Sequence, residues 1–290
     1  MAKIKIEFQK IHGLGNDFVI FDNLSGIIPR EKMSELAKKI CDRHFGIGCD
    51  GLIGLVRGES GFYFMDYWNS DGSFAEMCGN GIRALAKYII DNNFYEKVDE
   101  INIETGAGVK NLKIFYDNQG KVDSVKVNMG EPIFNLEKIP VSNVKEEKPP
   151  YSLKIDEKKF LFYPISMGNP HAVIFVDEIT DELVLECGPK IETYTEIFPQ
   201  KTNVEFIKIL NEHEIQMRVW ERGCGETLAC GTGASASAVA SIVYKNLKSP
   251  ITVHLLGGDL LIEYEPYKNP NVFMTGKATY VFKGEIEVEI

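Results

Sequence analysis

The sequence predicts an α/β (α+β) protein built from two pseudo-symmetric halves, each a mostly antiparallel curled sheet or barrel around a central helix. The chain has 290 residues, of which 44% are hydrophobic, and this length exceeds the usual size of one core. Short strands rich in Val, Ile and Phe alternate with few helices, which favours antiparallel sheet over repeated βαβ units. Related motifs also recur in both halves of the chain.

The clearest repeat is built on the two tryptophans of the chain. Trp68 and Trp220 each lie ten residues before a cysteine that opens a Cys-Gly-x-Gly motif. These cysteines are Cys78 and Cys230, and each is followed by a helical pattern. The equal spacing predicts that a strand, a glycine-rich loop and a helix occur once in each half.

Two further pairs of positions keep the same offset. Asn16 and Asn169, each in a Gly-Asn turn before an apolar strand, lie 62 and 61 residues before their cysteines. Gly51 and Asn203 each lie 27 residues before theirs. Agreement at three separate places predicts that one half is a duplicate of the other.

The domain boundary follows from this repeat. We expect an N-terminal half over residues 1–128 and a C-terminal half over 129–276, joined after a strand-like segment at 124–129. The Lys-, Glu- and Pro-rich run at 144–150 is interpreted as an exposed loop rather than a hinge.

The individual elements follow from periodicity. The first ten residues alternate apolar and polar side chains like a half-buried strand and lack the apolar run of a signal peptide. Residues 30–44 predict one amphipathic helix. After Cys78, apolar residues at helical spacing predict a helix that buries one face, whereas after Cys230 the small apolar run predicts a helix surrounded by protein.

Composition narrows the class of partner. A formal charge of −10 opposes binding to nucleic acid or to an anionic membrane, so we expect a small-molecule partner. No apolar run approaches the ~20 residues of a membrane span. Six cysteines in 290 residues fit reduced thiols, which predicts a cytoplasmic protein.

The loops after the two cysteines predict an anion site. Gly231, Thr232 and Gly233 leave little side chain in the way, so backbone N–H groups and the helix N-terminus can converge on an anion. The same field favours a thiolate at Cys230, and a glycine loop at a helix start is expected to expose the thiol and lower its pKa.

The cysteines and the glycine loops also admit other interpretations. A small buried hydrophobe is the expected role of Cys41, Cys49 and Cys187, and Cys224 is similarly undistinguished. Both loops match the dinucleotide pattern G-x-G-x-x-A, but the preceding strands end well before the first glycine. A metal site from Cys41, His44 and Cys49 lacks a second pair at ligand spacing, so no metal is expected.

Two thiols at equivalent places in the two halves suit inversion of a stereocentre. One thiolate removes a proton from one face of a carbon, and the opposite thiol delivers a proton to the other face. The paired helix N-termini would hold the carboxylate of an amino acid and stabilise the charge that builds as the α-carbon loses its proton. Such a reaction requires no cofactor.

Six motifs together resemble one family over nearly the whole chain. They are H-G-L-G-N-D-F at 12–18, N-S-D-G-S at 69–73, C-G-N-G-I-R at 78–83, G-N-P-H at 168–171, T-N-V-E-F at 202–206 and E-R-G-C-G-E-T-L-A-C-G-T-G at 221–233. The chain resembles diaminopimelate epimerase, the pyridoxal-phosphate-independent family that interconverts LL- and meso-diaminopimelate for lysine and peptidoglycan synthesis. The resemblance implies two α/β halves, with a C-terminal strand near 277–290 returning to the first half.

The resemblance also implies roles for individual residues. Cys78 and Cys230 would be the acid/base pair, assisted by His171 and Glu221. Substrate would be bound by Asn16, Asn69, Gly79, Asn80, Asn169, Asn203, Glu221, Arg222, Gly231 and Thr232. Backbone N–H groups of the glycine loops would hold the carboxylate at the reacting centre, and Arg222 offers a fork suited to the distal carboxylate. Some family members carry a substrate-contacting glutamine where this chain has Gly51.

Two other functions stay open from the sequence. A related two-thiol racemase of another amino acid, such as histidine, would share the cysteine pair, and a ligand-binding module would need neither thiol. Each of the predicted substrate-binding side chains, considered alone, could serve as a turn or cap residue instead of binding substrate. The residues leave the oligomeric state open, and a homodimer is one of the states that they allow.

Overall fold

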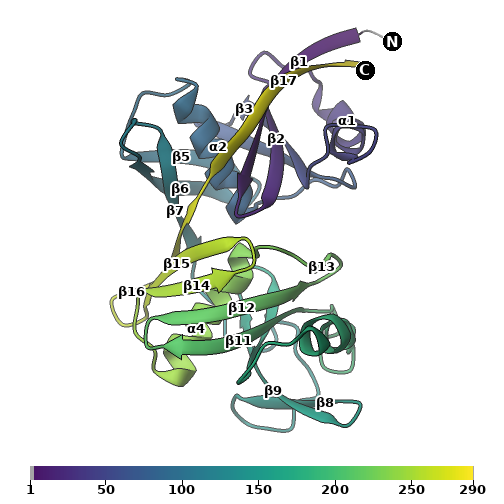
Figure 1. The fold of residues 1–290 in the computed structure, drawn as a ribbon, viewed down its shortest axis with the longest axis vertical. Helices are drawn as coiled ribbons and strands as arrows, with labels where there is room; N and C mark the ends of the chain where they lie inside the picture. Colours follow the sequence, from purple (N-terminus) through teal and green to yellow (C-terminus); the bar gives the residue numbers. More distant parts are fainter. Residues whose placement is uncertain (1–2, 290) are drawn as a thin grey trace. The chain divides into compact units, whose positions relative to one another are not determined.

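The computed structural model describes residues 3–289, which form two compact units. Unit 1 comprises Met1–Val127 together with Thr275–Ile290, and unit 2 comprises Asn128–Met274. The chain passes from one unit to the other within strands β7 (Val122–Gly130) and β16 (Asn269–Lys277) (Figure 1).

Unit 1 is one mixed, mostly antiparallel sheet around a helix. Only the β2/β3 and β4/β5 pairs are parallel within this sheet. Its strands run in the order β17 (Thr279–Glu289), β1 (Lys3–Gly13), β2 (Asn16–Asp22), β3 (Gly51–Arg57), β4 (Tyr63–Asn69), β5 (Glu100–Thr105), β6 (Gly108–Tyr116) and β7. Helix α2 (Gly79–Asp91) packs against β1 to β5, and α1 (Arg30–Cys41) packs against β3 and β4.

Unit 2 repeats this arrangement around helix α4 (Gly231–Lys245). Here only the β10/β11 and β12/β14 pairs are parallel. The strands run in the order β8 (Tyr151–Ile155), β9 (Lys158–Ser166), β10 (Pro170–Phe175), β11 (Asn203–Asn211), β12 (Glu214–Glu221), β14 (Ile251–Leu255) and β15 (Gly258–Glu265), with the short β13 (Gly225–Glu226) beside β12. A π-helix, η1 (Glu182–Cys187), and helix α3 (Gly188–Glu192) connect β10 to β11.

The registers of the two sheets show which residues are equivalent. Phe18 pairs with Gly51 across β2 and β3, and His171 pairs with Asn203 across β10 and β11. Further along, Leu52 pairs with Trp68 and Val204 pairs with Trp220. The predicted fold class, two pseudo-symmetric halves with curled, mostly antiparallel sheet around a central helix, is therefore confirmed.

Of the two central helices, α2 differs from the prediction in one respect. Nearly every residue of α2 is buried, including Arg83 and Lys87, rather than one apolar face. The apolar periodicity after Cys78 correctly predicts a helix, but the sheet curls far enough to cover the polar positions of α2 as well. Helix α4 is enclosed as predicted, with Gly233–Ser241 all buried.

The helix predicted over 30–44 ends earlier, at Cys41. The Asp42 carboxylate accepts hydrogen bonds from the backbone N–H groups of His44 and Phe45, at 2.7 Å each. These bonds turn the chain out of the helix, because they replace the i to i−4 pattern with a local turn. His44 therefore lies outside α1.

Candidate active site

Cys78 caps the N-terminus of α2. Its backbone is extended (φ −142°, ψ 119°), and its sulfur accepts a hydrogen bond from the Gly81 N–H at 3.4 Å. The first helical bond, from Ile82 N to Cys78 O, comes only one residue later. The N–H groups of Gly79 and Asn80 therefore precede the helical ladder, as expected for an anion-binding helix start.

A buried arginine lies beneath this helix start. Arg83 is fully buried and donates to Asn80 Oδ1 at 2.7 Å and to Gly79 O at 3.0 Å. Burial lowers the pKa of Arg83 to about 10, while a thiolate at Cys78 works in the opposite direction. The guanidinium stays charged at neutral pH, and its charge favours the thiolate form of Cys78.

Asn16 connects β2 to the same helix start. Its Oδ1 accepts from Asn80 Nδ2 at 3.1 Å, and the Cys78 sulfur lies 3.9 Å away. Its Nδ2 donates to Asp50 Oδ2 at 2.8 Å. The structure therefore brings together the predicted site residues Asn16, Cys78 and Asn80 by side-chain hydrogen bonds.

Asn69 and Gly51 lie opposite each other across β3 and β4. The Asn69 carboxamide donates to Ser73 Oγ at 3.0 Å, within the turn that follows β4. A Cβ atom added to Gly51 would lie 2.3 Å from Cε2 of Tyr67. The Tyr67 ring thus occupies the space that a side chain at position 51 would need.

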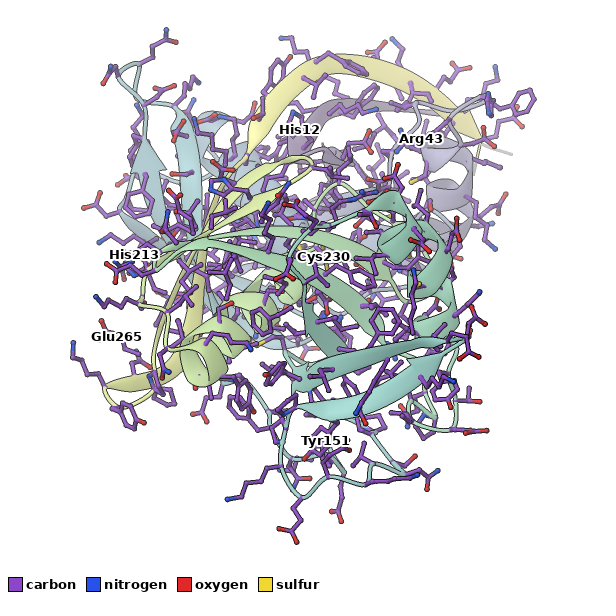
Figure 2. All side chains as sticks on the ribbon, turned by 60° about the horizontal axis from the view of Figure 1, so that its bottom comes forward. His12, Arg43, Tyr151, His213, Cys230 and Glu265 are labelled. Carbon is purple, nitrogen blue, oxygen red and sulfur yellow. The ribbon has the colours of Figure 1, made fainter. Side chains whose placement is uncertain are left out.

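Cys230 caps α4 in the same way as Cys78 caps α2 (Figure 2 labels Cys230). Its backbone is extended (φ −116°, ψ 107°), and its sulfur accepts from the Gly233 N–H at 3.4 Å. The Thr232 hydroxyl lies 3.5 Å from the same sulfur. The helical ladder begins with Ala234 N to Cys230 O, so Gly231 and Thr232 precede it as Gly79 and Asn80 do in unit 1.

The expectation that the loop exposes Cys230 and lowers its pKa is wrong. Cys230 is only 4% exposed, and its pKa is raised well above the ordinary value, first by burial and then by the carboxylates of Glu221 and Glu205. The bonds from Thr232 and Gly233 lower the pKa but are outweighed. In this conformation the desolvation of a charged sulfur exceeds the stabilisation from the helix N-terminus.

A chain of hydrogen bonds leads from a buried carboxyl group to this sulfur. Glu205 Oε1 lies 2.7 Å from His171 Nδ1, and His171 Nε2 lies 3.0 Å from Asn169 Oδ1. Asn169 Nδ2 donates to Thr232 Oγ1 at 3.3 Å, and Thr232 reaches Cys230. The structure therefore joins the predicted residues His171, Asn169, Thr232 and Cys230 in one path.

The remaining predicted residues of unit 2 surround the end of β12. Asn203 donates to Pro170 O at 2.8 Å and accepts from the Arg222 backbone N–H at 2.9 Å. The exposed Arg222 side chain donates through Nη1 to Gln200 O at 3.2 Å. Glu221 accepts a hydrogen bond from Thr227 Oγ1 and contributes negative charge near Cys230.

Three residues next to the thiols were missed from the sequence: Glu205, Arg83 and Tyr67. Glu205 lies in the motif at 202–206 and Arg83 in the motif at 78–83, but neither was predicted to act in the site. A detectable signal existed for Glu205, since a carboxylate within the apolar run at 204–207 must be buried with a partner. Tyr67 gave no such signal, because an aromatic residue in a strand is ordinary.

The other cysteines were mostly placed as expected. Cys41, Cys49 and Cys187 are buried, and the sulfurs of Cys41 and Cys49 lie 3.3 Å apart. Cys224, for which no role is predicted, is exposed on the turn between β12 and β13.

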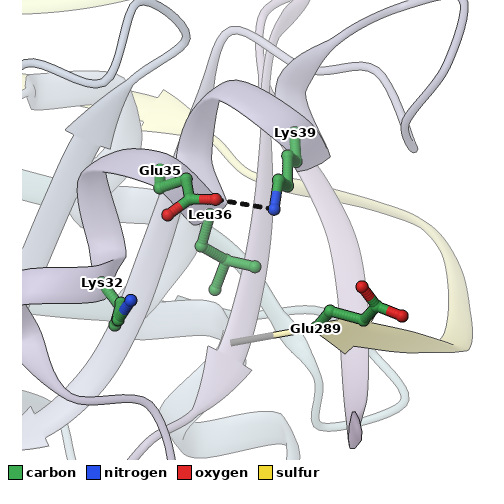
Figure 3. Close-up of a pocket in the computed structure, with 5 residues that line it drawn as sticks. All are labelled: Lys32, Glu35, Leu36, Lys39 and Glu289. Atoms are coloured by element: carbon green, nitrogen blue, oxygen red, sulfur yellow. Dashed lines mark ion pairs between the residues drawn. The ribbon is translucent and has the colours of Figure 1, made fainter. Parts of the chain in front are cut away.

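A shallow depression lies away from these residues (Figure 3). It is lined by Lys32, Glu35, Leu36 and Lys39 of α1 and by Glu289. Glu35 and Lys39 form an exposed ion pair at 2.7 Å, a type of contact that contributes little. Within residues 3–289, no helix is both long enough and apolar enough to cross a bilayer.

The chain is similar in sequence to proteins described as diaminopimelate epimerases. The family described as diaminopimelate epimerase matches residues 8–135 and 163–281. A diaminopimelate epimerase of Methanococcus maripaludis is 46% identical over 285 residues, covering 98% of this chain and 100% of the relative. One from Acetivibrio thermocellus is 46% identical over 283 residues, covering 98% and 99%.

Solved structures show the same fold at low identity. A PhzF-family phenazine biosynthesis protein from Bacillus anthracis superimposes with a TM-score of 0.71 at 18% identity, covering 100% of both chains. A hydroxyproline epimerase from Agrobacterium vitis gives a TM-score of 0.70 at 12% identity, covering 99% of this chain and 92% of that one. The sequence matches over nearly the full length go further than this shared fold: the chain belongs to the diaminopimelate epimerase family, a family of isomerases.

Proposed function

We propose that the chain interconverts LL- and meso-diaminopimelate by two-base proton transfer at the α-carbon, with Cys78 and Cys230 as the two proton carriers. The observation that carries the proposal is the pair of equivalent thiols, each capping the N-terminus of the enclosed helix of its unit. Serine or aspartate caps a helix better than cysteine. Two cysteines at these places are therefore better explained by chemistry than by helix stability.

The surroundings of the two thiols support different protonation states. The buried guanidinium of Arg83 favours a thiolate at Cys78, whereas burial and two carboxylates keep Cys230 a thiol. A two-base inversion needs one deprotonated and one protonated group at the start of each turnover. The positive charge of Arg83 near Cys78 and the burial of Cys230 are in keeping with that need.

In this mechanism each residue has a defined task. One thiolate removes the α-proton, and the other thiol delivers a proton to the opposite face. Backbone N–H groups of Gly79, Asn80, Gly231 and Thr232 stabilise the negative charge that develops on the α-carboxylate. Asn16, Asn69, Asn169, Asn203, Glu221 and Arg222 hold the remaining polar groups of the substrate, and His171 and Glu221 assist the thiols.

Four broader expectations belong to the same proposal. The product would supply lysine and peptidoglycan synthesis, and two reactive thiols fit a reducing cytoplasm. The reaction as drawn uses no cofactor. A homodimer is the assembly we expect, which the molar mass in solution, measured by light scattering, can test.

The decisive experiment is isotope exchange. Incubation with LL-diaminopimelate in deuterated water should replace the α-proton while meso product forms, as followed by proton NMR. Replacing Cys78 or Cys230 by Ala should reduce inversion by at least ~10²–10⁴-fold, because each thiol is the sole proton carrier for one face. Circular dichroism should show an unchanged fold.

A panel of substrates tests the assignment to diaminopimelate. The kcat/KM for LL-diaminopimelate should exceed the values for lysine, histidine and lanthionine. A higher value for any of these three would make the chain a racemase of another amino acid. Full activity in either single cysteine variant would contradict the two-thiol mechanism itself.

A further inference from the structure

The two units carry different residues beneath their capping thiols, and these residues differ in whether they can ionise. The register of the strands makes Phe18 and Ile53 of unit 1 equivalent to His171 and Glu205 of unit 2. The glycine at the third position of each helix confirms this match. A Cβ added to Gly81 would meet Ile53 Cδ1 at 3.3 Å and Phe18 Cε1 at 3.4 Å, whereas one added to Gly233 would meet Glu205 Oε1 at 2.8 Å.

An apolar pair in one unit is thus replaced by an ionisable pair in the other. Glu205 and His171 are both fully buried, and no described residue bonds the second carboxyl oxygen of Glu205. Burial raises the pKa of Glu205, with the His171 ring acting in the opposite direction. Unit 1 shows that this position can be filled by isoleucine, so packing alone does not require a carboxyl group there.

The hydrogen bonds around His171 have a consistent direction. Asn169 donates through Nδ2 to Thr232, so its Oδ1 is the atom that faces His171 Nε2. An amide oxygen only accepts, and Nε2 must therefore carry a hydrogen. Glu205 at Nδ1 is compatible with this, either as a carboxyl group donating to a neutral ring or as a carboxylate accepting from a charged ring.

The same chain determines what Thr232 offers to Cys230. Because its oxygen already accepts from Asn169, the hydroxyl hydrogen is available for the sulfur 3.5 Å away. A hydroxyl donor to sulfur stabilises the thiolate, in opposition to the burial and the carboxylates that disfavour it. The direction of every bond in the path therefore depends on which ring nitrogen of His171 carries a hydrogen.

We infer that Glu205 is a positioning residue for Cys230: it holds His171 with a hydrogen on Nε2, and through Asn169 this turns the Thr232 hydroxyl toward the sulfur. The inference rests on the proposed function, because a thiol that must gain and lose a proton needs such a donor. Glu205 touches neither substrate nor sulfur in this role. It assists the second thiol only, since unit 1 has Ile53 at the equivalent place.

The ring hydrogen can be observed directly. Long-range proton–nitrogen NMR spectra of protein labelled with ¹⁵N-histidine distinguish the two ring tautomers, and a His171→Gln variant assigns the signals of His171 among the five histidines. We expect a protonated Nε2 in the wild type and in Glu205→Gln, because the new amide N–H can donate to Nδ1. An unprotonated Nε2 in the wild type overturns the inference, whatever the variants do.

A second readout follows the sulfur. The rate at which iodoacetamide alkylates Cys230, resolved by peptide mass spectrometry over a pH series, reports its thiolate fraction. The titratable groups that act on it are Glu221 on β12 and Glu205 on β11, and His171 on β10 is bonded to Glu205. Glu205→Met and Glu205→Gln both remove the carboxylate that disfavours the thiolate, so the comparison between them isolates the hydrogen bond. Glu205→Met, which cannot donate to His171, should be alkylated about five- to tenfold more slowly at neutral pH than Glu205→Gln, the effect of one lost hydrogen bond.

The matched control is Ile53→Met, which places the same side chain at the equivalent position of unit 1. It should leave alkylation of Cys230 unchanged. Equal rates in folded Glu205→Met and Glu205→Gln overturn the inference, and if the Met variant does not fold, the tautomer in the wild type decides. Neither readout uses a substrate, so failure to epimerise diaminopimelate would count against the proposed function alone.

Discussion

Gly51 shows how a single residue sets the space beside a thiol. Its neighbour Tyr67 is buried, makes an edge-to-face contact with Phe18 at 5.8 Å between ring centroids, and has its hydroxyl pKa raised by burial. The ring fills the space that a larger residue at 51 would require. The glutamine of some relatives therefore cannot be introduced here without moving Tyr67.

This close approach predicts the outcome of Gly51→Gln. The substitution should lower the free energy of unfolding by about 1 to 3 kcal/mol, the usual cost of overpacking, as measured by urea denaturation. Gly54→Ala in the same strand is the control, because its Cβ would meet ordinary contacts no closer than 3.4 Å. Combining Gly51→Gln with Tyr67→Leu should recover part of the loss, and equal effects at 51 and 54 would contradict the steric account.

Arg222 supplies a second prediction at this scale, about the substrate. Diaminopimelate carries a carboxylate and an ammonium group away from the reacting carbon, and a charged hydrogen bond to such a group is worth ~1.5–3 kcal/mol. Arg222→Met should therefore lower kcat/KM for diaminopimelate by about 10- to 100-fold. Within residues 3–289 the exposed side chain bonds only the carbonyl of Gln200, so stability should change little.

The control for that variant is Lys268→Met, which removes another exposed positive charge from unit 2. It should leave kcat/KM unchanged at the ionic strength of the assay. If both variants lose activity equally, the loss reflects net charge rather than a bidentate contact of the guanidinium. If neither loses activity, Arg222 does not bind the distal carboxylate.

At the scale of elements, the two helix starts offer a matched pair of substitutions. Gly81 and Gly233 both stand at the third helical position and both donate an N–H to a capping sulfur. Alanine is favoured over glycine in helices by ~1 kcal/mol, so Gly81→Ala, with contacts of 3.3 to 3.4 Å, should be nearly neutral. Gly233→Ala would place a methyl group 2.8 Å from Glu205 Oε1 and 3.2 Å from the Cys230 sulfur.

We therefore expect Gly233→Ala to lose stability and turnover while Gly81→Ala keeps both. Thermal unfolding and kcat in both directions measure the two effects. Equal tolerance at both positions would mean that Glu205 can move away from α4 at little cost. Equal damage would mean that the first turn of either helix, rather than its neighbour, is sensitive to a side chain.

For the individual elements, the sequence predicted the features that depend on local periodicity and on the spacing of motifs. The repeat around Trp68 and Trp220 identified both caps, and the apolar periodicity identified both central helices. It could not predict the burial of Cys230, because desolvation depends on every strand that covers α4. It also could not pair His171 with Glu205, since only the parallel register of β10 and β11 brings these residues together.

At the scale of the whole molecule, the proposed reaction requires both thiols to reach opposite faces of one α-carbon. Their sulfurs must then approach each other closely when no substrate separates them, and an oxidant should be able to join them. Diamide accepts the two electrons and two protons that two thiols release on forming a disulfide. We expect treatment with diamide to abolish epimerase activity, and a thiol reductant to restore it.

One other thiol pair can compete for the oxidant, and it makes the test sharper. The sulfurs of Cys41 and Cys49 lie 3.3 Å apart within unit 1, so a disulfide between them could also accompany inactivation. In a Cys41→Ala, Cys49→Ala variant that competitor is gone, and inactivation should persist with peptide mapping that joins Cys78 to Cys230. Substrate present during oxidation should protect activity, because the proposed reaction places the α-carbon between the two thiols. An inactive protein that contains only other cysteine pairs, or a double variant that resists diamide, would contradict the shared α-carbon and with it the two-thiol mechanism.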